Sequence, residues 1–109
     1  ISIGDNHARE KVWKALAKAD HEFEFPNLIH PSAVLGLKVE IGPGTVIMPQ
    51  ANIGPFSRVG TCCIVNSCAN IDHDCLLNDF ASVAPGAVLG GAVTLGIGAA
   101  VSIGATVKH

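Results

Sequence analysis

The stretch "IGPGTVIMPQANIGPFSRVG", from Ile41 to Gly60, repeats itself every six residues. An aliphatic residue stands at every sixth place, and a small or β-branched residue follows four places after it. Glycine follows one place after most of the aliphatic residues, and glycine tolerates the geometry of tight turns. Neither an α-helix, with a period of about 3.6, nor a flat amphipathic strand, with a period of about 2, has this spacing. A short internal repeat of this kind predicts a stacked β-helix.

The six-residue period continues without an insertion over about three quarters of the chain. The aliphatic positions are Ile29, Leu35, Ile41, Ile47, Ile53, Val59, Val65, Ile71, Leu77, Val83, Leu89, Leu95, Val101 and Val107. Three short strands of this kind complete one triangular coil, with the aliphatic residues inside and a small residue beside each corner. We therefore predict an all-β parallel β-helix of hexapeptide repeats over residues 29–109.

Residues 1–28 have a different pattern. "ISI" is a short β-branched run, "GDN" reads as a turn, and Asp5 or Asn6 can cap a helix. The helix that follows places apolar residues at helical spacing and charged residues on its other face. The apolar positions are Ala8, Val12, Ala15, Leu16 and Ala19, and the charged ones are Arg9, Glu10, Lys14 and Lys18. We expect residues 1–28 to be a strand-helix remnant of an α/β domain plus a linker.

Composition excludes several classes of protein. The chain has 109 residues, of which only 15% are charged, and a formal net charge of -2, which argues against nucleic-acid binding. No apolar run approaches the roughly 20 residues that span a bilayer, and no signal peptide is visible. The chain does not begin with Met, so we expect further residues upstream. The four cysteines, Cys62, Cys63, Cys68 and Cys75, lack metal-binding spacing and are expected to be buried, reduced thiols of a cytoplasmic protein.

The segment "CANIDHDCLLNDF" (68–80) places His73 between Asp72 and Asp74. His73 is the third residue of its hexad, so it should lie at a corner facing solvent. Gly91 is one coil later, so the imidazole should face a position without a side chain. A solvated turn, with Gly91 needed only for a positive φ angle, is one interpretation. A proton-transfer site is the other.

The chain also resembles a known group of enzymes. The segments "LIHPSA" (28–33), "IMPQANI" (47–53), "NSCANIDHDC" (66–75) and "DFASVAPGAVLGG" (79–91) resemble the bacterial sugar O-acyltransferases of the sialic acid O-acetyltransferase type. This group includes nucleotide-amino-sugar N-acetyltransferases. "ISIGDNHAREKV" (1–12) is similar to the end of their N-terminal sugar-nucleotide-binding domain.

The resemblance implies a left-handed β-helix, a homotrimer, and acetyl transfer from acetyl-CoA to an amine or hydroxyl of a sugar or nucleotide-sugar, without a metal. It implies that His73 is the general base and that Asp72 and Asp74 are the acids around it. Asn66 matches a polar neighbour of the family motif, and Ser82 stands where some members carry a second histidine. Gly91 matches the residue whose backbone N–H meets the thioester oxygen as it becomes an oxyanion.

Three further expectations concern alternatives and assembly. The chain could be a truncated, non-catalytic β-helix that serves as an oligomerising structural or interaction module. A metal-dependent hydratase would need three histidines on one metal, and only His30, His73 and His109 lie in the repeat. For assembly, we expect the outward residues Val34, Val46, Ile64 and Val88 to form one apolar face that favours the homotrimer.

Overall fold

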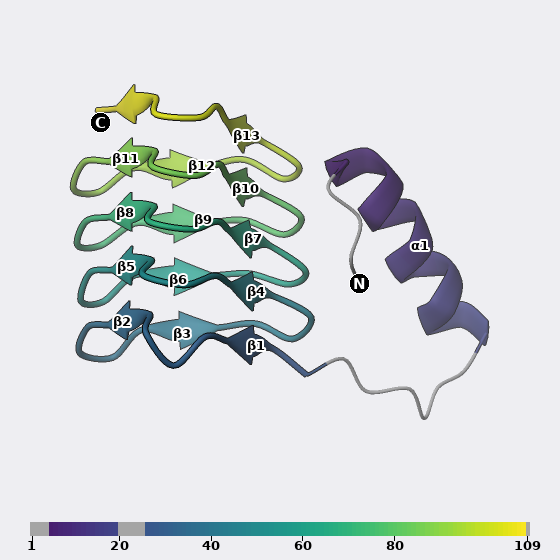
Figure 1. Ribbon diagram of the computed structural model, residues 1–109. Coiled ribbons are helices and arrows are strands. Elements are labelled where there is room, and N and C mark those ends of the chain that lie inside the picture. Colours follow the sequence, from purple (N-terminus) through teal and green to yellow (C-terminus); the bar gives the residue numbers. More distant parts are fainter. Residues whose placement is uncertain (1–4, 20–25, 109) are drawn as a thin grey trace.

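The computed structural model describes residues 5–19 and 26–108. Over these residues a single helix, α1 (Asn6–Ala19), precedes a run of two-residue strands stacked in coils (Figure 1). The strands are β1 (Leu28–Ile29), β2 (Val34–Leu35), β3 (Glu40–Ile41), β4 (Val46–Ile47), β5 (Asn52–Ile53), β6 (Arg58–Val59), β7 (Ile64–Val65), β8 (Asn70–Ile71), β9 (Leu76–Leu77), β10 (Ser82–Val83), β11 (Val88–Leu89), β12 (Thr94–Leu95), β13 (Ala100–Val101) and β14 (Thr106–Val107). The strand expected at residues 1–3 lies outside the described residues.

The strands form three parallel sheets, one for each face of a triangular prism. The sheet orders are β1-β4-β7-β10-β13, β2-β5-β8-β11-β14 and β3-β6-β9-β12. Each strand pairs with the strand three further along the chain, so that Ile47 lies beside Val65 and Ile53 beside Ile71. The register is therefore eighteen residues per coil, and the predicted all-β parallel β-helix is confirmed.

The inside of the prism is filled by the aliphatic residue of each hexad and by the small residue beside each corner. The inward residues from Ile47 to Val101 are buried, whereas Ile29 and Leu35 in the first coil are exposed because no coil of the described residues lies beneath them. One aliphatic side chain from each strand is enough to fill this narrow interior, which explains why the inward position of every hexad is aliphatic.

The prediction of one apolar outer face is wrong. Val34 and Val88 belong to the sheet of β2 and β11, whereas Val46 and Ile64 belong to the sheet of β4 and β7. Successive hexads lie on successive faces of the prism, so only outward residues that are a multiple of eighteen apart share a face.

Helix α1 lies along one side of the stack (Figure 1). Asp5 caps the helix, because its Oδ1 accepts a hydrogen bond from Ala8 N at 2.8 Å, as one of the two capping predictions stated. The prediction that Arg9 lies on the solvent face of the helix is wrong. Arg9 is only 1% exposed, and it donates to the carbonyls of Cys62 and Phe80, each at 2.8 Å. The corners of a β-helix present unpaired carbonyls, and a guanidinium is well suited to bind two of them.

The cysteines follow the prediction with one exception. Cys62, Cys63 and Cys75 are buried free thiols, whereas Cys68 is exposed and the expectation of burial is wrong for it. Cys62 and Cys68 both lie at corners with a positive φ angle, but α1 packs on the corner of Cys62, where Arg9 binds its carbonyl, and no described element covers Cys68. In the part of the chain that the structure describes, no helix is long and apolar enough to cross a membrane.

Candidate functional site

His73 lies at the corner between β8 and β9, on the opposite side of the stack from α1 (Figure 1). We call residues 72–75, together with residues 90–93 of the next coil, the His73 corner. Backbone hydrogen bonds to both neighbouring coils hold it: Asp74 N donates to Pro55 O at 3.0 Å, and Ala92 N donates to His73 O at 2.9 Å. The corner is therefore a rigid platform from which the side chain of His73 projects, as predicted.

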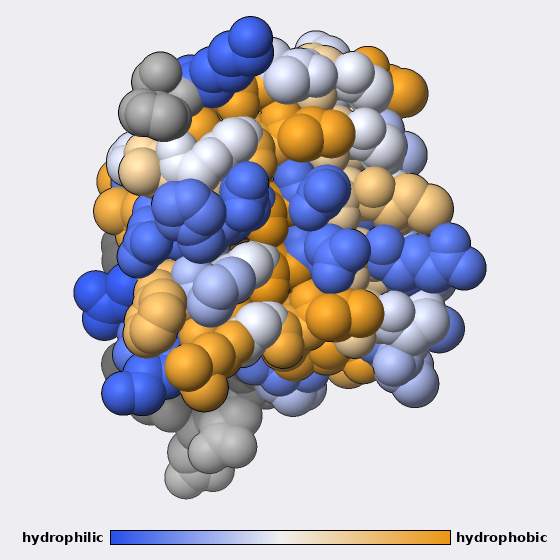
Figure 2. Space-filling view, turned by 90° about the vertical axis from the view of Figure 1, so that its left-hand side faces the viewer, coloured by the Kyte–Doolittle hydropathy of each residue, from blue (hydrophilic) through white to orange (hydrophobic). Residues whose placement is uncertain are grey.

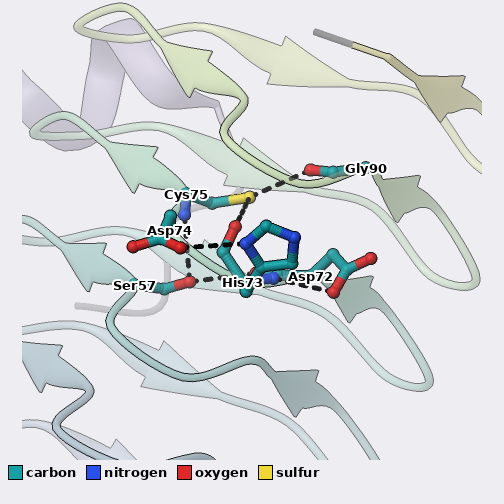
Figure 3. Close-up of polar contacts among 6 residues, drawn as sticks. All are labelled: Ser57, Asp72, His73, Asp74, Cys75 and Gly90. Carbon is teal, nitrogen blue, oxygen red and sulfur yellow. Dashed lines mark hydrogen bonds and ion pairs between the residues drawn. The ribbon is translucent and has the colours of Figure 1, made fainter.

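The imidazole of His73 is paired with one of its two neighbouring acids (Figure 3). Nδ1 of His73 lies 2.9 Å from Oδ2 of Asp74, and both side chains are more than half exposed. An ionised carboxylate can only accept a hydrogen bond, so Nδ1 carries the proton and Nε2 is left with a free lone pair.

The two acids have different roles in the geometry. The hydrogen bond that Nδ1 donates to Asp74, with smaller contributions from the charges of Asp72 and Asp74, raises the pKa of His73 above its usual value. The carboxylate of Asp72 makes no hydrogen bond to the imidazole, and its Oδ1 instead accepts a hydrogen bond from the backbone N of His73 at 2.8 Å. Asp74 orients the imidazole and raises its pKa, and Asp72 fixes the backbone from which the imidazole projects.

Gly91 leaves room for the imidazole itself. A Cβ atom added to Gly91 would lie 2.5 Å from Nε2 and 2.8 Å from Cε1 of His73. The positive φ angles of this corner belong to Asp74 and Ala92, and Gly91 is not among the described residues with positive φ. The interpretation of Gly91 as a turn glycine is therefore wrong, and the close approach of His73 accounts for the missing side chain.

Ser57 and Cys75 hold the corner from inside, and sequence reasoning did not assign a role to either. Ser57 Oγ donates to Asp72 O at 3.0 Å and accepts from Cys75 N at 3.1 Å. The Cys75 thiol donates to Gly90 O at 3.2 Å (Figure 3). Burial raises the pKa of the Cys75 thiol, so it keeps its proton and acts as a donor. The only signal in the sequence is that both residues belong to the column of small residues, eighteen apart.

Asn66 and Ser82 lie elsewhere in the coil. Asn66 follows β7 at a different corner, and its Oδ1 accepts a hydrogen bond from Ser67 N at 2.8 Å. Ser82 begins β10, and its Oγ accepts from Asn6 Nδ2 of α1 at 3.1 Å. Within one chain the structure brings together His73, Asp72, Asp74 and Gly91, but it brings neither Asn66 nor Ser82 to them.

The residues that a metal site would need are also separated. His30 lies at the corner after β1 and contacts Ser32, whereas His73 lies at the corner after β8. His109 lies outside the described residues. Among the residues that are described, no group of three His, Cys, Asp or Glu side chains could hold a metal ion.

The surface around the His73 corner is mixed. Figure 2 shows this side of the molecule, where hydrophilic side chains gather across the middle and hydrophobic ones lie above and below them. Phe56, at the corner one coil before His73, is 50% exposed, and Leu37, at the corner two coils before it, is 66% exposed. A polar, titratable group is thus bordered by apolar surface on the side toward the N-terminus.

Comparisons with known proteins place this geometry in context, although no family model matches the chain. GDP-perosamine N-acetyltransferase of Escherichia coli O157:H7 is 28% identical over 109 residues, which are 100% of this chain and 48% of the relative. A solved histidine-to-alanine variant of GDP-perosamine N-acetyltransferase from Caulobacter crescentus, in complex with CoA and GDP-perosamine, has a TM-score of 0.92 and 36% identity. The match covers 98% of this chain and 50% of that one.

A second enzyme domain is similar over the same residues. The acetyltransferase domain of PglB from Neisseria gonorrhoeae FA1090 has a TM-score of 0.78 and 34% identity, over 98% of this chain and 54% of that chain. It has also been solved in complex with acetyl coenzyme A. The chain spans about half the length of the relatives it matches. The chain is homologous to these acetyltransferases, which confirms the resemblance identified from the sequence and supports the left-handed sense of the β-helix.

Proposed function

We propose that this chain carries the catalytic centre of an acetyl-CoA-dependent acetyltransferase that acts on an amino group of a nucleotide-linked sugar. One observation carries the proposal: Nδ1 of His73 is bound to Asp74 and the side chain is more than half exposed, so that in the neutral imidazole Nε2 keeps the lone pair that can take a proton. The names of the relatives support the choice of substrates, since their solved complexes contain CoA or acetyl-CoA, and GDP-perosamine. Acetyl-CoA is a co-substrate here, and no metal takes part in the proposed reaction.

The proposed reaction is a direct transfer. The nitrogen of the acceptor attacks the carbonyl carbon of the thioester, a C–N bond forms, and the proton of the amine passes to Nε2 of His73. The C–S bond then breaks, and the departing thiolate of CoA takes the proton back from the imidazolium. The products are the N-acetylated sugar and CoA, and the enzyme is returned to its starting state without a covalent intermediate.

Asp74 and Gly91 stabilise the two charges that develop, on the imidazolium of His73 and on the oxyanion of the thioester. Asp74 stabilises the imidazolium, in line with the raised pKa of His73. The backbone N–H of Gly91 is a candidate donor to the oxyanion of the thioester, because Gly91 lies directly beside the imidazole and its N–H makes no hydrogen bond to the described residues. Asp72 holds the backbone of His73 in place.

We further propose that the active form is a homotrimer. Exposed apolar residues such as Leu37 and Phe56 border the His73 corner, and contiguous apolar surface is uncommon on soluble monomers. Asn66 and Ser82 could contact the substrate only if a second copy brings them to the His73 corner. Light scattering in solution should give three times the mass of one chain, and a monomer at micromolar concentration would contradict the trimer.

Two other features of the chain also stand as proposals. Residues 1–28 are assigned to the end of a sugar-nucleotide-binding α/β domain, and residues 29–109 to the catalytic β-helix. A cytoplasmic location fits the four free thiols and the use of acetyl-CoA.

The test is an acetylation assay on the purified chain. We expect acetyl-CoA and a nucleotide-linked amino sugar to give free CoA, detected as thiol, and a sugar nucleotide heavier by one acetyl group. The matching hydroxyl sugar serves as the control that separates N- from O-transfer. No product with either acceptor, from a folded trimer, would favour the non-catalytic interaction module instead.

A further inference from the structure

The thiol of Cys75 lies directly behind the His73 corner, and the proposed reaction does not use it. Cys75 is 2% exposed, and its thiol donates to the carbonyl of Gly90 at 3.2 Å. The neighbouring backbone groups are held by other bonds: Gly90 N donates to Val107 O at 2.8 Å, and Ala92 N donates to His73 O at 2.9 Å. Among the described residues, the thiol makes the only hydrogen bond to the peptide unit that joins Gly90 to Gly91.

The orientation of this peptide unit decides where the N–H of Gly91 points. A trans peptide directs its carbonyl and its N–H to opposite sides. Because the buried thiol holds the Gly90 carbonyl toward the inside of the prism, the N–H of Gly91 is directed outward. Gly91 is also the residue at which an added Cβ would collide with the imidazole of His73. The thiol therefore fixes the direction of the donor that stands beside the base.

We propose that Cys75 is a positioning residue, whose thiol aims the Gly91 N–H at the thioester oxygen of acetyl-CoA. The inference rests on the proposed acetyl transfer. The raised pKa of the buried thiol agrees with this role, because Cys75 must keep its proton to donate. Ser57 makes the equivalent bond one coil earlier, where its Oγ donates to Asp72 O at 3.0 Å. A serine hydroxyl can therefore perform the same task in this column.

The fold supplies a matched control. Cys63 is buried at the corner that faces α1, and its thiol donates to Asn78 O at 3.2 Å, the same distance as in the Cys75 bond. Thr45 lies beneath Cys63 as Ser57 lies beneath Cys75, and it donates to Gly60 O at 2.8 Å. A change that removes the thiol should thus cost similar stability at either corner, but only Cys75 lies behind His73.

The first experiment measures acetyl transfer by Cys75→Val, Cys75→Ser and Cys63→Val in the full chain. Losing an oxyanion donor outright costs about 100- to 1,000-fold in kcat, so misdirecting it in Cys75→Val should cost roughly 10- to 100-fold. Cys75→Ser should stay within about threefold of the wild type, because the donor is restored. Cys63→Val should keep the wild-type kcat, and all variants should keep the wild-type pH profile since His73 and Asp74 are untouched. Equal losses of kcat in Cys75→Val and Cys63→Val would overturn the proposal.

The second experiment does not depend on activity, so it separates this inference from the proposed function. We expect the amide resonance of Gly91 in a ¹H–¹⁵N spectrum to shift in Cys75→Val, to return in Cys75→Ser, and to stay in place in Cys63→Val. If the wild type acetylates no acceptor, the proposed function fails and this spectrum alone decides the positioning role. A Gly91 resonance that is unchanged in Cys75→Val would overturn it. Should Cys75→Val fail to fold, Cys75→Ala gives the same comparison with a smaller side chain.

Discussion

The His73 corner and the corner that α1 covers have the same internal construction and opposite surroundings. We call residues 60–63 with residues 78–81 the Arg9 corner. In both corners a buried hydroxyl of one coil and a buried thiol of the next donate to the carbonyl that opens the following turn. The distances agree within 0.2 Å between Thr45 and Ser57 and are equal for Cys63 and Cys75. The same internal hydrogen bonds therefore occur at both corners, and they do not by themselves create a catalytic site.

The outer side chains make the difference. In the Arg9 corner the carboxylate of Asp79 accepts a hydrogen bond from Thr61 N at 2.8 Å, and Arg9 of α1 binds the carbonyls of Cys62 and Phe80. In the His73 corner the corresponding place above the histidine is Gly91, and no described element covers it. One corner has its polar groups satisfied by the chain, and the other leaves the imidazole of His73 exposed, next to the N–H of Gly91 that we propose as a donor.

The aromatic residues show the same contrast. Phe80 of the Arg9 corner is buried, and its ring lies 6.5 Å from that of Trp13 in an edge-on arrangement. Phe56, below the His73 corner, is half exposed. A strongly bound helix stabilises the first corner, whereas the second corner keeps apolar surface available for a substrate or a neighbouring copy.

The largest effect on catalysis is expected when one methyl group is added at Gly91 in the His73 corner. In Gly91→Ala the new Cβ would collide with Nε2 and Cε1 of His73, so the exposed imidazole must rotate away. Misplacing a catalytic group by about 1 Å can cost about 100-fold, and we expect kcat to fall by about that factor with little change in stability. Gly96→Ala is the matched control, because nothing lies within 4 Å of its added Cβ. Equal rates for the two variants would show that Gly91 makes no room for the base.

The opposite result is expected at Arg9. Arg9→Met keeps an unbranched apolar stem but leaves the carbonyls of Cys62 and Phe80 without the guanidinium. Since an unsatisfied buried polar group costs about 1 to 3 kcal/mol, we expect the free energy of unfolding in urea to fall by about 2 to 4 kcal/mol. Lys14→Met, which removes an exposed ion pair with Glu10, should change it by less than about 0.5 kcal/mol. A loss of kcat per folded molecule in Arg9→Met would contradict the separation of the two corners.

A smaller effect, on the pH dependence of the rate, should distinguish Asp74 from Asp72. The base must be unprotonated to act, so the raised pKa of His73 places the acid limb of the rate profile above the usual histidine range. Asp74→Asn removes the hydrogen bond to the carboxylate and one negative charge, so the pKa falls and the limb should move to lower pH. Asp72→Asn removes only a charge and should move the limb less. Rates measured between pH 5 and 9 decide this, and a larger shift for Asp72→Asn would contradict the pairing of His73 with Asp74.

The sequence predicted the fold and the position of Gly91 next to His73 because both depend on the repeat. A period of six places every inward residue, and a register of eighteen places Gly91 over His73 before any coordinates are known. It could not predict the burial of Arg9, because the carbonyls that bind it become neighbours only after the coils stack. The division of Val34 and Val46 between two faces follows from the same period but requires the correct assignment of hexads to sheets. The role of Cys75 depends on a side chain binding a carbonyl fifteen residues later, which no local pattern indicates.

The most direct test of the account is the rate of acetyl transfer by His73→Ala beside that of His30→Ala. Both histidines are exposed at corners of the same β-helix, but His30 contacts Ser32 and no carboxylate. The account predicts that His73→Ala lowers kcat by about 100- to 10,000-fold, the range for losing a general base, while the dissociation constant of acetyl-CoA changes little. His30→Ala should keep the wild-type rate. A His73→Ala variant that transfers acetyl groups as fast as the wild type would contradict the account.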